Sequence, residues 1–240
     1  MTAPTRRADR RTGTTGPGTP PAILRASGLH HSYGATPVLR GIDFQVREGE
    51  TVSIMGQSGS GKSTLLHLLA GLLLPESGAV YLDGVRLDQL PERRRAELRL
   101  RRMGFVFQFG DLVPELSLVE NVELPLRVTG HRRRPSRRRA MEMLDRLGVA
   151  GVAQQRVSEV SGGQAQRAAV ARALVHEPAV VLADEPTGSL DTTTGELVLE
   201  ALMSAAQEQN SAVVLVTHEL SVAAWSQRTV MLRDGREVQA

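Results

Sequence analysis

Apolar and polar positions alternate along the chain in a way that predicts an α/β fold. A leucine-dense stretch from Lys62 to Ala70, ending near Gly71, and a second stretch from Ala165 to Leu174 predict helices. Short apolar runs between polar residues predict buried strands at residues 51–55, 80–82, 105–107, 180–183 and 213–216. Strands that alternate with helices imply a parallel sheet with helices on both faces.

Three segments depart from this alternation. From Ala22 to Gln45 the pattern predicts short strands around a turn at Tyr33-Gly34, which we assign to a small antiparallel β subdomain. From about residue 112 to 165, helical patterns are broken by Pro125, Gly130 and Pro135, and we predict a helical subdomain inserted into the core. Residues 1–20 are rich in Thr, Gly, Pro and Arg and predict a disordered tail, which leaves residues 21–240 as one domain.

Composition narrows the class of protein. The chain has no cysteine, which excludes disulfides and thiolate metal sites and favours a reducing compartment. No apolar run approaches the roughly 20 residues that span a bilayer, and no apolar segment follows the N-terminal arginines as in a signal peptide. We therefore expect a cytoplasmic chain.

Charge is distributed unevenly. The formal net charge is +3, and the tail accounts for all of it with four arginines against one aspartate, so that residues 21–240 sum to zero. Lys62 is the only lysine among 29 basic residues. A sequence of this kind uses lysine where the planar guanidinium of arginine does not serve.

That lysine lies in a phosphate-loop pattern between a predicted strand and a predicted helix. The pattern comprises Gly56, Gln57, Ser58, Gly59, Ser60, Gly61, Lys62, Ser63 and Thr64. Its glycines let the backbone N–H groups wrap a polyphosphate, and the helix N-terminus adds a favourable dipole. Lys62 would contact the β- and γ-phosphates and Ser63 would ligate Mg²⁺, so the loop predicts ATP and Mg²⁺ as cofactors.

Two further patterns carry chemistry. The apolar run at 180–183 ends in Asp184 and Glu185, which places one carboxylate for Mg²⁺ and a second beside the γ-phosphate to polarise water. Taken alone, such residues often cap a helix. A second anion site is predicted where serine and glycines open an apolar helix, at Ser161, Gly162, Gly163 and Gln164, although the same pattern also suits an ordinary capped helix.

In this order and combination the motifs resemble those of the ATP-binding-cassette (ABC) ATPases, from about Leu24 to the C-terminus. The resemblance implies that Tyr33 stacks on adenine, that Gln108 reaches Mg²⁺ and the attacking water, and that Glu185 is the catalytic base. It also implies that His218 contacts the γ-phosphate, that the 161–164 signature closes over ATP held by a second copy of the chain, and that Asp191 belongs to a D-loop and is a further ATP-binding residue. The implied fold is a P-loop NTPase, and the implied activity is ATP hydrolysis in a homodimer.

A narrower resemblance points to a partner. Residues 112–122 and 182–191 look like those of the lipoprotein-release, macrolide-exporter and cell-division group, whose ATPases pair with permeases that carry large extracytoplasmic domains. This implies a peripheral location on the inner face of the cell membrane, with either export or mechanical signalling as the outcome. A soluble ABC ATPase of the iron–sulfur assembly type is the alternative.

Two surfaces follow from these expectations. Phe109, Leu112 and Val113 come after a predicted strand beside Gln108, and we expect them to be exposed where a permease docks. Arginines cluster at 93–102 and 131–139, which is typical of a solvated face or of contact with anionic lipid. No aromatic residues are interleaved with them, so nucleic acid is not an expected partner.

Overall fold

The computed structural model describes residues 21–108 and 111–238, so the predicted tail and Phe109 lie outside the described residues. A six-stranded sheet has the order β10-β9-β3-β8-β7-β6, and its strands are parallel except for β10. The strands are β3 (Thr51–Met55), β6 (Met103–Phe107), β7 (Val180–Asp184), β8 (Ala212–Thr217), β9 (Arg228–Arg233) and β10 (Arg236–Val238).

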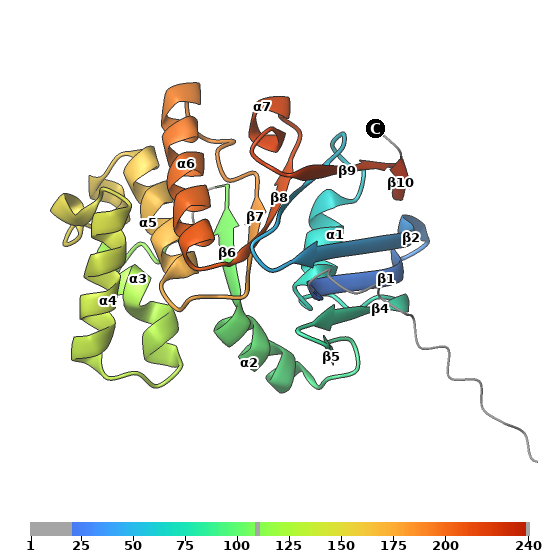
Figure 1. Cartoon of the computed structure of the whole chain (residues 1–240), viewed down its shortest axis with the longest axis horizontal. Helices are drawn as coiled ribbons and strands as arrows, with labels where there is room; N and C mark the ends of the chain where they lie inside the picture. Colours follow the sequence, from blue (N-terminus) through green and yellow to red (C-terminus); the bar gives the residue numbers. More distant parts are fainter. Residues whose placement is uncertain (1–20, 109–110, 239–240) are drawn as a thin grey trace, which may run out of the picture.

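A second, antiparallel sheet of order β2-β1-β4-β5 lies at one end of the molecule (Figure 1). Its strands are β1 (Ala22–Tyr33), β2 (Thr36–Arg47), β4 (Ser77–Leu82) and β5 (Val85–Arg86). The first two strands have 12 residues each, longer than the short strands predicted. Register shifts within the β1–β2 pair interrupt the alternation of inward and outward residues. The full length of these strands therefore could not be predicted from an alternating apolar and polar pattern.

Seven α-helices are found in the described residues. They are α1 (Lys62–Leu69), α2 (Glu92–Arg102), α3 (Leu118–Val128), α4 (Arg133–Arg146), α5 (Gly162–Leu174), α6 (Thr192–Glu208) and α7 (Leu220–Ala223). Short 3₁₀ turns, η1 (Ala150–Val152) and η2 (Val157–Glu159), connect α4 to α5. Within 21–108 and 111–238, no helix has both the length and the apolar character needed to cross a membrane.

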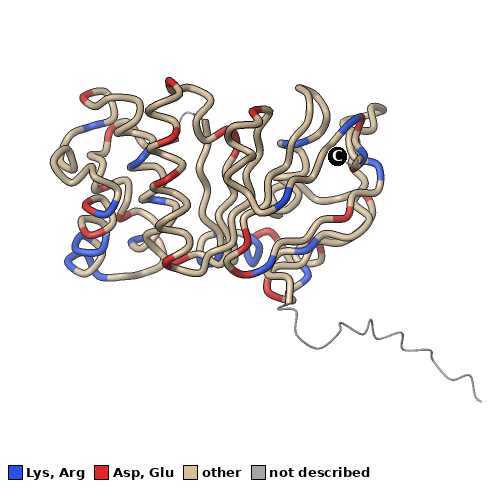
Figure 2. Tube along the Cα trace, turned by 45° about the horizontal axis from the view of Figure 1, so that its top comes forward, with Lys and Arg blue, Asp and Glu red and all other residues tan. Residues whose placement is uncertain are grey.

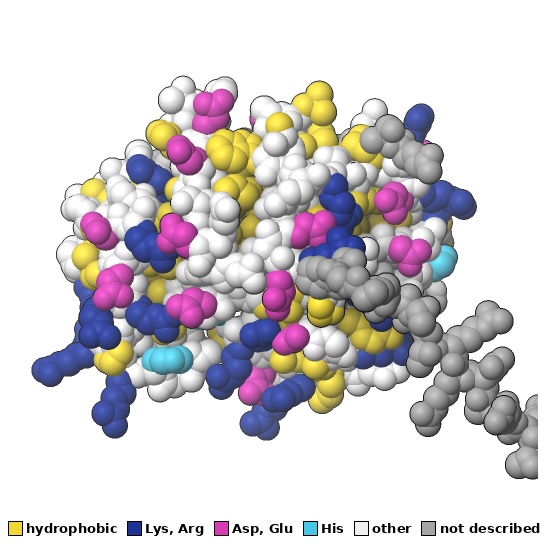
Figure 3. Space-filling view, viewed as in Figure 1, with side chains coloured by type: hydrophobic (Ala, Val, Ile, Leu, Met, Phe, Trp, Pro, Cys, Tyr) yellow, Lys and Arg dark blue, Asp and Glu magenta, His cyan; other side chains and the backbone are white. Residues whose placement is uncertain are grey.

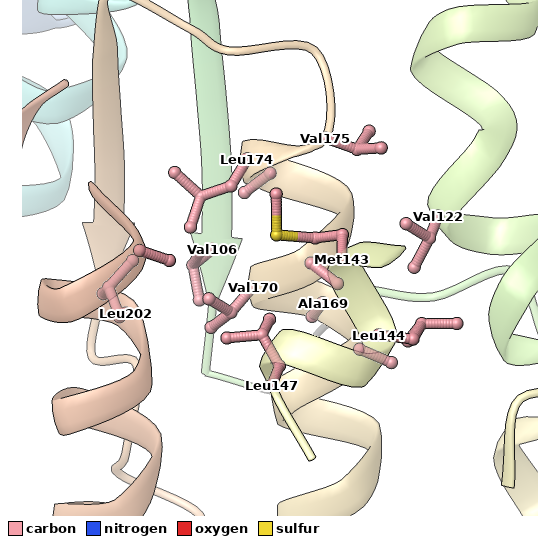
Figure 4. Close-up of a cluster of buried hydrophobic side chains, with 14 of the residues drawn as sticks. Val106, Val122, Met143, Leu144, Leu147, Ala169, Val170, Leu174, Val175 and Leu202 are labelled. Atoms are coloured by element: carbon pink, nitrogen blue, oxygen red, sulfur yellow. The ribbon is translucent and has the colours of Figure 1, made fainter. Parts of the chain in front are cut away.

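Alternation within the central strands builds two cores. Val181 and Leu215 face a cluster formed with α3, α4, α5 and α6, whereas Leu182 and Val214 face a cluster formed with α1 and the antiparallel sheet. Figure 4 shows the first cluster, where Val106 of β6, Val170 of α5 and Leu202 of α6 converge. The parallel sheet is therefore covered on both faces, as the sequence predicts.

Prolines behave differently from the prediction. Pro125 lies inside α3 and Pro135 inside α4, so neither residue breaks its helix. Pro135 is in the first turn, where its missing N–H would have no intrahelical acceptor. In α3, a reciprocal capping box between Ser117 and Glu120 and an apolar buried face offset the bond that Pro125 cannot make. Gly130, with φ +93°, does follow the end of α3.

The predicted helical subdomain, at about 112–165, contains α3 and α4, which pack on α5 and share its apolar cluster. Figure 1 shows these helices at the end of the molecule opposite the antiparallel sheet. The exact boundaries of this subdomain stay a prediction.

Candidate functional site

A cleft of about 920 Å³ lies at the carboxyl ends of β3 and β7. It is lined by thirteen of the residues predicted from the sequence: Tyr33, Gly56, Gln57, Ser58, Gly59, Gly61, Lys62, Ser63, Thr64, Gln108, Asp184, Glu185 and His218. Val38, Met55 and Met231 also line it, and these apolar residues were not singled out from the sequence. The topology therefore gathers the phosphate loop, the two carboxylates and the histidine around one cavity.

The phosphate loop follows β3 and leads directly into α1. A Cβ atom on Gly56 would lie 2.3 Å from the carbonyl oxygen of Leu232, so only glycine fits this approach to β9. Helix α1 begins with no side-chain cap and no acidic residue in its first turn. Its N-terminal N–H groups, which lack intrahelical acceptors, are thus left to an anion in the cleft.

The Lys62 side chain forms hydrogen bonds with the backbone of its own loop. Its Nζ donates to the carbonyl oxygens of Gly56 at 2.8 Å and Gln57 at 3.1 Å. The ammonium is thereby kept at the centre of the loop, within the cavity, where a phosphate can exchange for these carbonyls. Ser60, within the loop, is buried, and its hydroxyl has no hydrogen-bond partner among the described residues.

Asp184 ends β7 beside Ser63. Burial raises the pKa of the Asp184 carboxyl, while a hydrogen bond from Ser63 opposes that shift. A hydroxyl and a carboxylate are hard oxygen donors of the kind that Mg²⁺ prefers. Both line the cleft next to the loop, so this donor set fits the ion that the sequence predicts.

Glu185 is held in place by two neighbours. Its Oε1 accepts a 2.7 Å hydrogen bond from Nδ1 of His218, and its Oε2 accepts one of 3.3 Å from the hydroxyl of Thr217. The hydrogen bond with Glu185 raises the pKa of His218, and the charge of the carboxylate adds to the shift. The Glu185 backbone has φ +47°, the left-handed region, immediately before Pro186. The carboxylate is therefore oriented toward the cleft by contacts on both oxygens.

Gln108 reaches the cleft from the end of β6, and the surrounding bonds fix this strand end. Its carbonyl oxygen accepts from the hydroxyl of Ser189 at 2.8 Å. Gln166 of α5 donates from Nε2 to the carbonyl oxygens of Phe107 and Pro186, each at 2.8 Å. Gln166 is buried, and sequence reasoning missed it. No clear signal in the sequence marked it, because Gln166 stands among other polar residues at the start of α5.

Six predicted residues do not line this cleft. Ser60 is buried within the loop, whereas five lie at the starts of α5 and α6: Ser161, Gly162, Gly163, Gln164 and Asp191. Ser161 and Gln164 form a reciprocal capping box, and Asp191 caps α6 by accepting from the N–H of Thr194 at 3.0 Å. A Cβ on Gly163 would lie 2.3 Å from the Thr194 methyl group, so the two helix starts are in close contact.

The expected apolar docking surface needs a correction. Leu112 is buried, with 9% exposure, and belongs to the core cluster of α3 to α6 rather than to the surface. It packs inward because the following residue, Val113, is tied by its N–H and carbonyl to the side chain of Asn121 at 2.7 and 3.0 Å. Val113 itself is 37% exposed, as expected.

Comparison with known proteins places this architecture in a family. The sequence pattern of the ABC transporter family matches residues 39–188. The chain belongs to the ABC transporter family of ATPases. A lipoprotein-releasing system ATP-binding protein, LolD from Hydrogenovibrio crunogenus, is 49% identical over 220 residues, 89% of this chain and 94% of that protein. LolD 2 from Caulobacter vibrioides is 44% identical over 217 residues, 89% of this chain and 95% of that protein.

A solved structure extends the comparison of this ABC ATPase to three dimensions. The dimeric post-hydrolysis state of the ATP-binding cassette MJ0796, bound to ADP and Pi, aligns with a TM-score of 0.81 at 37% identity. The alignment covers 90% of this chain and 98% of that chain. The predicted fold and the predicted activity, ATP hydrolysis, are thereby confirmed, while the role of each site residue stays a prediction.

Proposed function

We propose that this ABC ATPase binds MgATP in the cleft, pairs with a second copy around it, and uses hydrolysis to drive a separate membrane permease. The observation that carries the proposal is the position of β6. Its carboxyl end leads to Gln108 in the cleft, while Phe105 of the same strand lines a groove on the surface. A change at the nucleotide can thus be transmitted along one strand to a docked partner.

The groove has a volume of about 340 Å³ and lies between α2, β6, α3 and α5. Leu100, Phe105 and Pro125 give it an apolar lining, and Arg99 and His176 add polar groups at its sides. Such a groove suits an amphipathic helix of a partner. This partner would be an integral membrane permease, with the ATPase peripheral on the cytoplasmic face of the membrane. The relatives named lipoprotein-releasing system ATP-binding proteins make a permease for lipid-anchored proteins the first one to test.

The chemistry follows from the residues in the cleft. Lys62 would exchange the carbonyls of Gly56 and Gln57 for phosphate oxygens, and the N-terminus of α1 would hold the same phosphates. Glu185 would orient water and accept its proton, held in place by His218. Ser63 and Asp184, with Gln108, would hold Mg²⁺, which would neutralise charge on the phosphates. Ser161 to Gln164 and Asp191 would contact ATP bound to the other copy.

Affinity purification from detergent-solubilised membranes tests the partner. Wild-type protein is expected to retain an integral membrane protein that stimulates its ATPase activity. Leu100→Glu in the groove should lose both retention and stimulation while its basal ATPase activity is unchanged. Val85→Glu, an exposed valine on β5, is the matched control and should behave as wild type.

Two results would contradict the proposal. One is retention of the membrane protein by Leu100→Glu at the wild-type level, which would remove the groove from its role. The other is enrichment of soluble proteins alone by the wild type, which would favour the alternative function in a soluble complex of the iron–sulfur assembly type.

A further inference from the structure

Charge is strongly separated within the body of the molecule although its sum is zero. Residues 92–102 and 132–146 together hold thirteen arginines and four acidic residues. The rest of residues 21–240 holds twelve basic and twenty-one acidic residues. The chain therefore has one positive region on a negative body, which orients a protein in the field of a charged surface.

The two arginine-rich segments lie along the same edge of the molecule. In Figure 1, α2 and the turn from α3 into α4 are both at the lower edge, and Figure 2 shows basic positions gathered there. Figure 3 shows Lys and Arg side chains projecting outward along this edge. We define the basic edge by its exposed arginines, Arg93, Arg94, Arg101, Arg132, Arg133, Arg134 and Arg138. The groove adjoins this edge, since its lining includes Leu100 of α2 and Pro125 of α3, the helix that leads into α4.

Several of these arginines have no role in holding the fold together. Within the basic edge, Arg94 and Arg101 pair with Glu97, and Arg138 pairs with Glu142. By contrast, the side chains of Arg93, Arg132 and Arg134 make no hydrogen bond or ion pair within residues 21–108 and 111–238. Arg133 exerts a through-space attraction on Glu120.

The position of the arginines on α4 is also unfavourable for the helix. Arg132 is the N-cap without a side-chain cap bond, Arg133 and Arg134 follow, and the first turn has no acidic residue. Cations near a helix N-terminus oppose the helix dipole. The buried residues of α4, including Ala140, Met143 and Leu144, hold the helix to the core independently of these charges. Helix stability therefore does not account for three arginines at this end.

We propose that the basic edge rests on an anionic bilayer, with Arg132, Arg133 and Arg134 contacting lipid phosphates beside the docked permease. Guanidinium groups match phosphate oxygens in pairs, and exposed arginines on both sides of the groove would face the bilayer that surrounds a permease. The two segments contain no aromatic residue, so they lack the stacking surfaces that single-stranded nucleic acid uses. The inference rests on the proposed function for its orientation, because the groove is the proposed permease site.

Co-sedimentation of the full chain with vesicles tests this contact without a permease. Wild type should bind phosphatidylglycerol vesicles, should not bind pure phosphatidylcholine vesicles, and should dissociate as salt rises. The triple variant Arg132→Gln, Arg133→Gln, Arg134→Gln should bind roughly 100-fold more weakly, about fivefold for each arginine. Its ATPase activity and thermal unfolding should match wild type, which shows that the fold is intact.

Two matched variants separate position from charge. Arg40→Gln, Arg233→Gln, Arg236→Gln removes three exposed arginines away from the basic edge and should bind as wild type. Arg6→Gln, Arg7→Gln, Arg10→Gln, Arg11→Gln measures the contribution of the tail, and binding that the edge variant abolishes should survive in it.

Three outcomes would overturn the inference. One is that the Arg40, Arg233 and Arg236 variant loses as much vesicle binding as the edge variant; another is that only the tail variant loses binding. The third is that wild type binds phosphatidylglycerol and phosphatidylcholine vesicles equally. Binding of a single-stranded oligonucleotide that is lost in the triple variant, with vesicle binding unchanged, would assign the edge to nucleic acid instead. The vesicles contain no permease, so failure here leaves the groove proposal standing, and failure of co-purification leaves the vesicle result standing.

Discussion

At the scale of single residues, Lys62 organises the phosphate loop through its hydrogen bonds. Its ammonium donates to the carbonyls of Gly56 and Gln57 and so connects the end of the loop to its beginning. A guanidinium is broader and planar, and cannot occupy this narrow position with the same contacts. The solitary lysine of an arginine-rich chain lines the cleft as its motif predicts, and its proposed contact with phosphate stays a prediction.

Glu185→Gln should reduce ATP turnover by about 10²–10⁴-fold while leaving ATP binding intact. The amide keeps the size of the carboxylate but cannot accept a proton from water. Because ATP then persists, MgATP should hold the protein as a dimer on size-exclusion chromatography. Turnover at the wild-type rate would remove Glu185 from the proposed role.

The pKa of His218, which Glu185 contacts, gives an independent measurement on this variant. Since the hydrogen bond to Glu185 is the largest cause of the raised pKa of His218, the amide should lower that pKa toward its ordinary value. An NMR titration of the nucleotide-free protein measures the change. In wild type, the raised pKa keeps His218 protonated to higher pH, so the ion pair is lost only as pH rises through that raised pKa.

At the scale of elements, the sequence predicted the strands that are apolar throughout better than those that alternate. The runs at β3, β7 and β8 are buried on both faces. Such strands are recognised as continuous apolar runs, without deciding which residues point inward and which point outward. In β1 and β2, register shifts interrupt the pattern, so their length could not be predicted. The prolines in α3 and α4 were misleading for a related reason, because packing and capping outweigh one missing hydrogen bond.

Gln166→Ala should lower the free energy of unfolding by about 1–3 kcal/mol, because it leaves the buried carbonyls of Phe107 and Pro186 without their donor. These bonds join α5 to the ends of β6 and β7, which carry Gln108 and Asp184. Urea unfolding measures the change. The control Gln207→Ala, at an exposed position of α6, should stay within about 0.5 kcal/mol of wild type. An equally small change in Gln166→Ala would show that these bonds contribute little.

At the scale of the whole molecule, the predicted phosphate contacts fall into two groups. The loop, Gln108, Asp184, Glu185 and His218 share one cleft, whereas the signature and Asp191 lie at two other helix starts. The sequence motifs predict the members of both groups. They do not predict that the two groups lie apart in one chain, because the order of motifs along a sequence gives no distances in space. Burial of Leu112 was missed for the same reason, since its surroundings come from helices distant in sequence.

Mixed dimers test whether the two groups meet between chains. Ser161→Arg and Lys62→Ala should each fail to form MgATP-dependent homodimers, because every site in them is damaged. Mixed together, in a Glu185→Gln background, they should form dimers that retain about one ATP, since both defects fall on one site of a two-fold pair and leave the other whole. Size-exclusion chromatography with nucleotide quantification measures this.

The same mixture also distinguishes the competing arrangement. If each ATP site lay within one chain, both sites of every mixed dimer would carry a defect. No dimer and no retained ATP would then appear on mixing, even though each variant remains folded.

The backbone conformation of Glu185 has opposite consequences for thermal stability and for the proposed catalytic activity. A glutamate at φ +47°, directly before proline, is held in a conformation that costs of order 1–3 kcal/mol, and glycine would adopt it freely. Random mutagenesis followed by a screen for survival at high temperature would therefore favour Glu185→Gly, a change that removes the proposed base. The strained backbone at Glu185 is therefore expected to lower the melting temperature for as long as the proposed base is kept there.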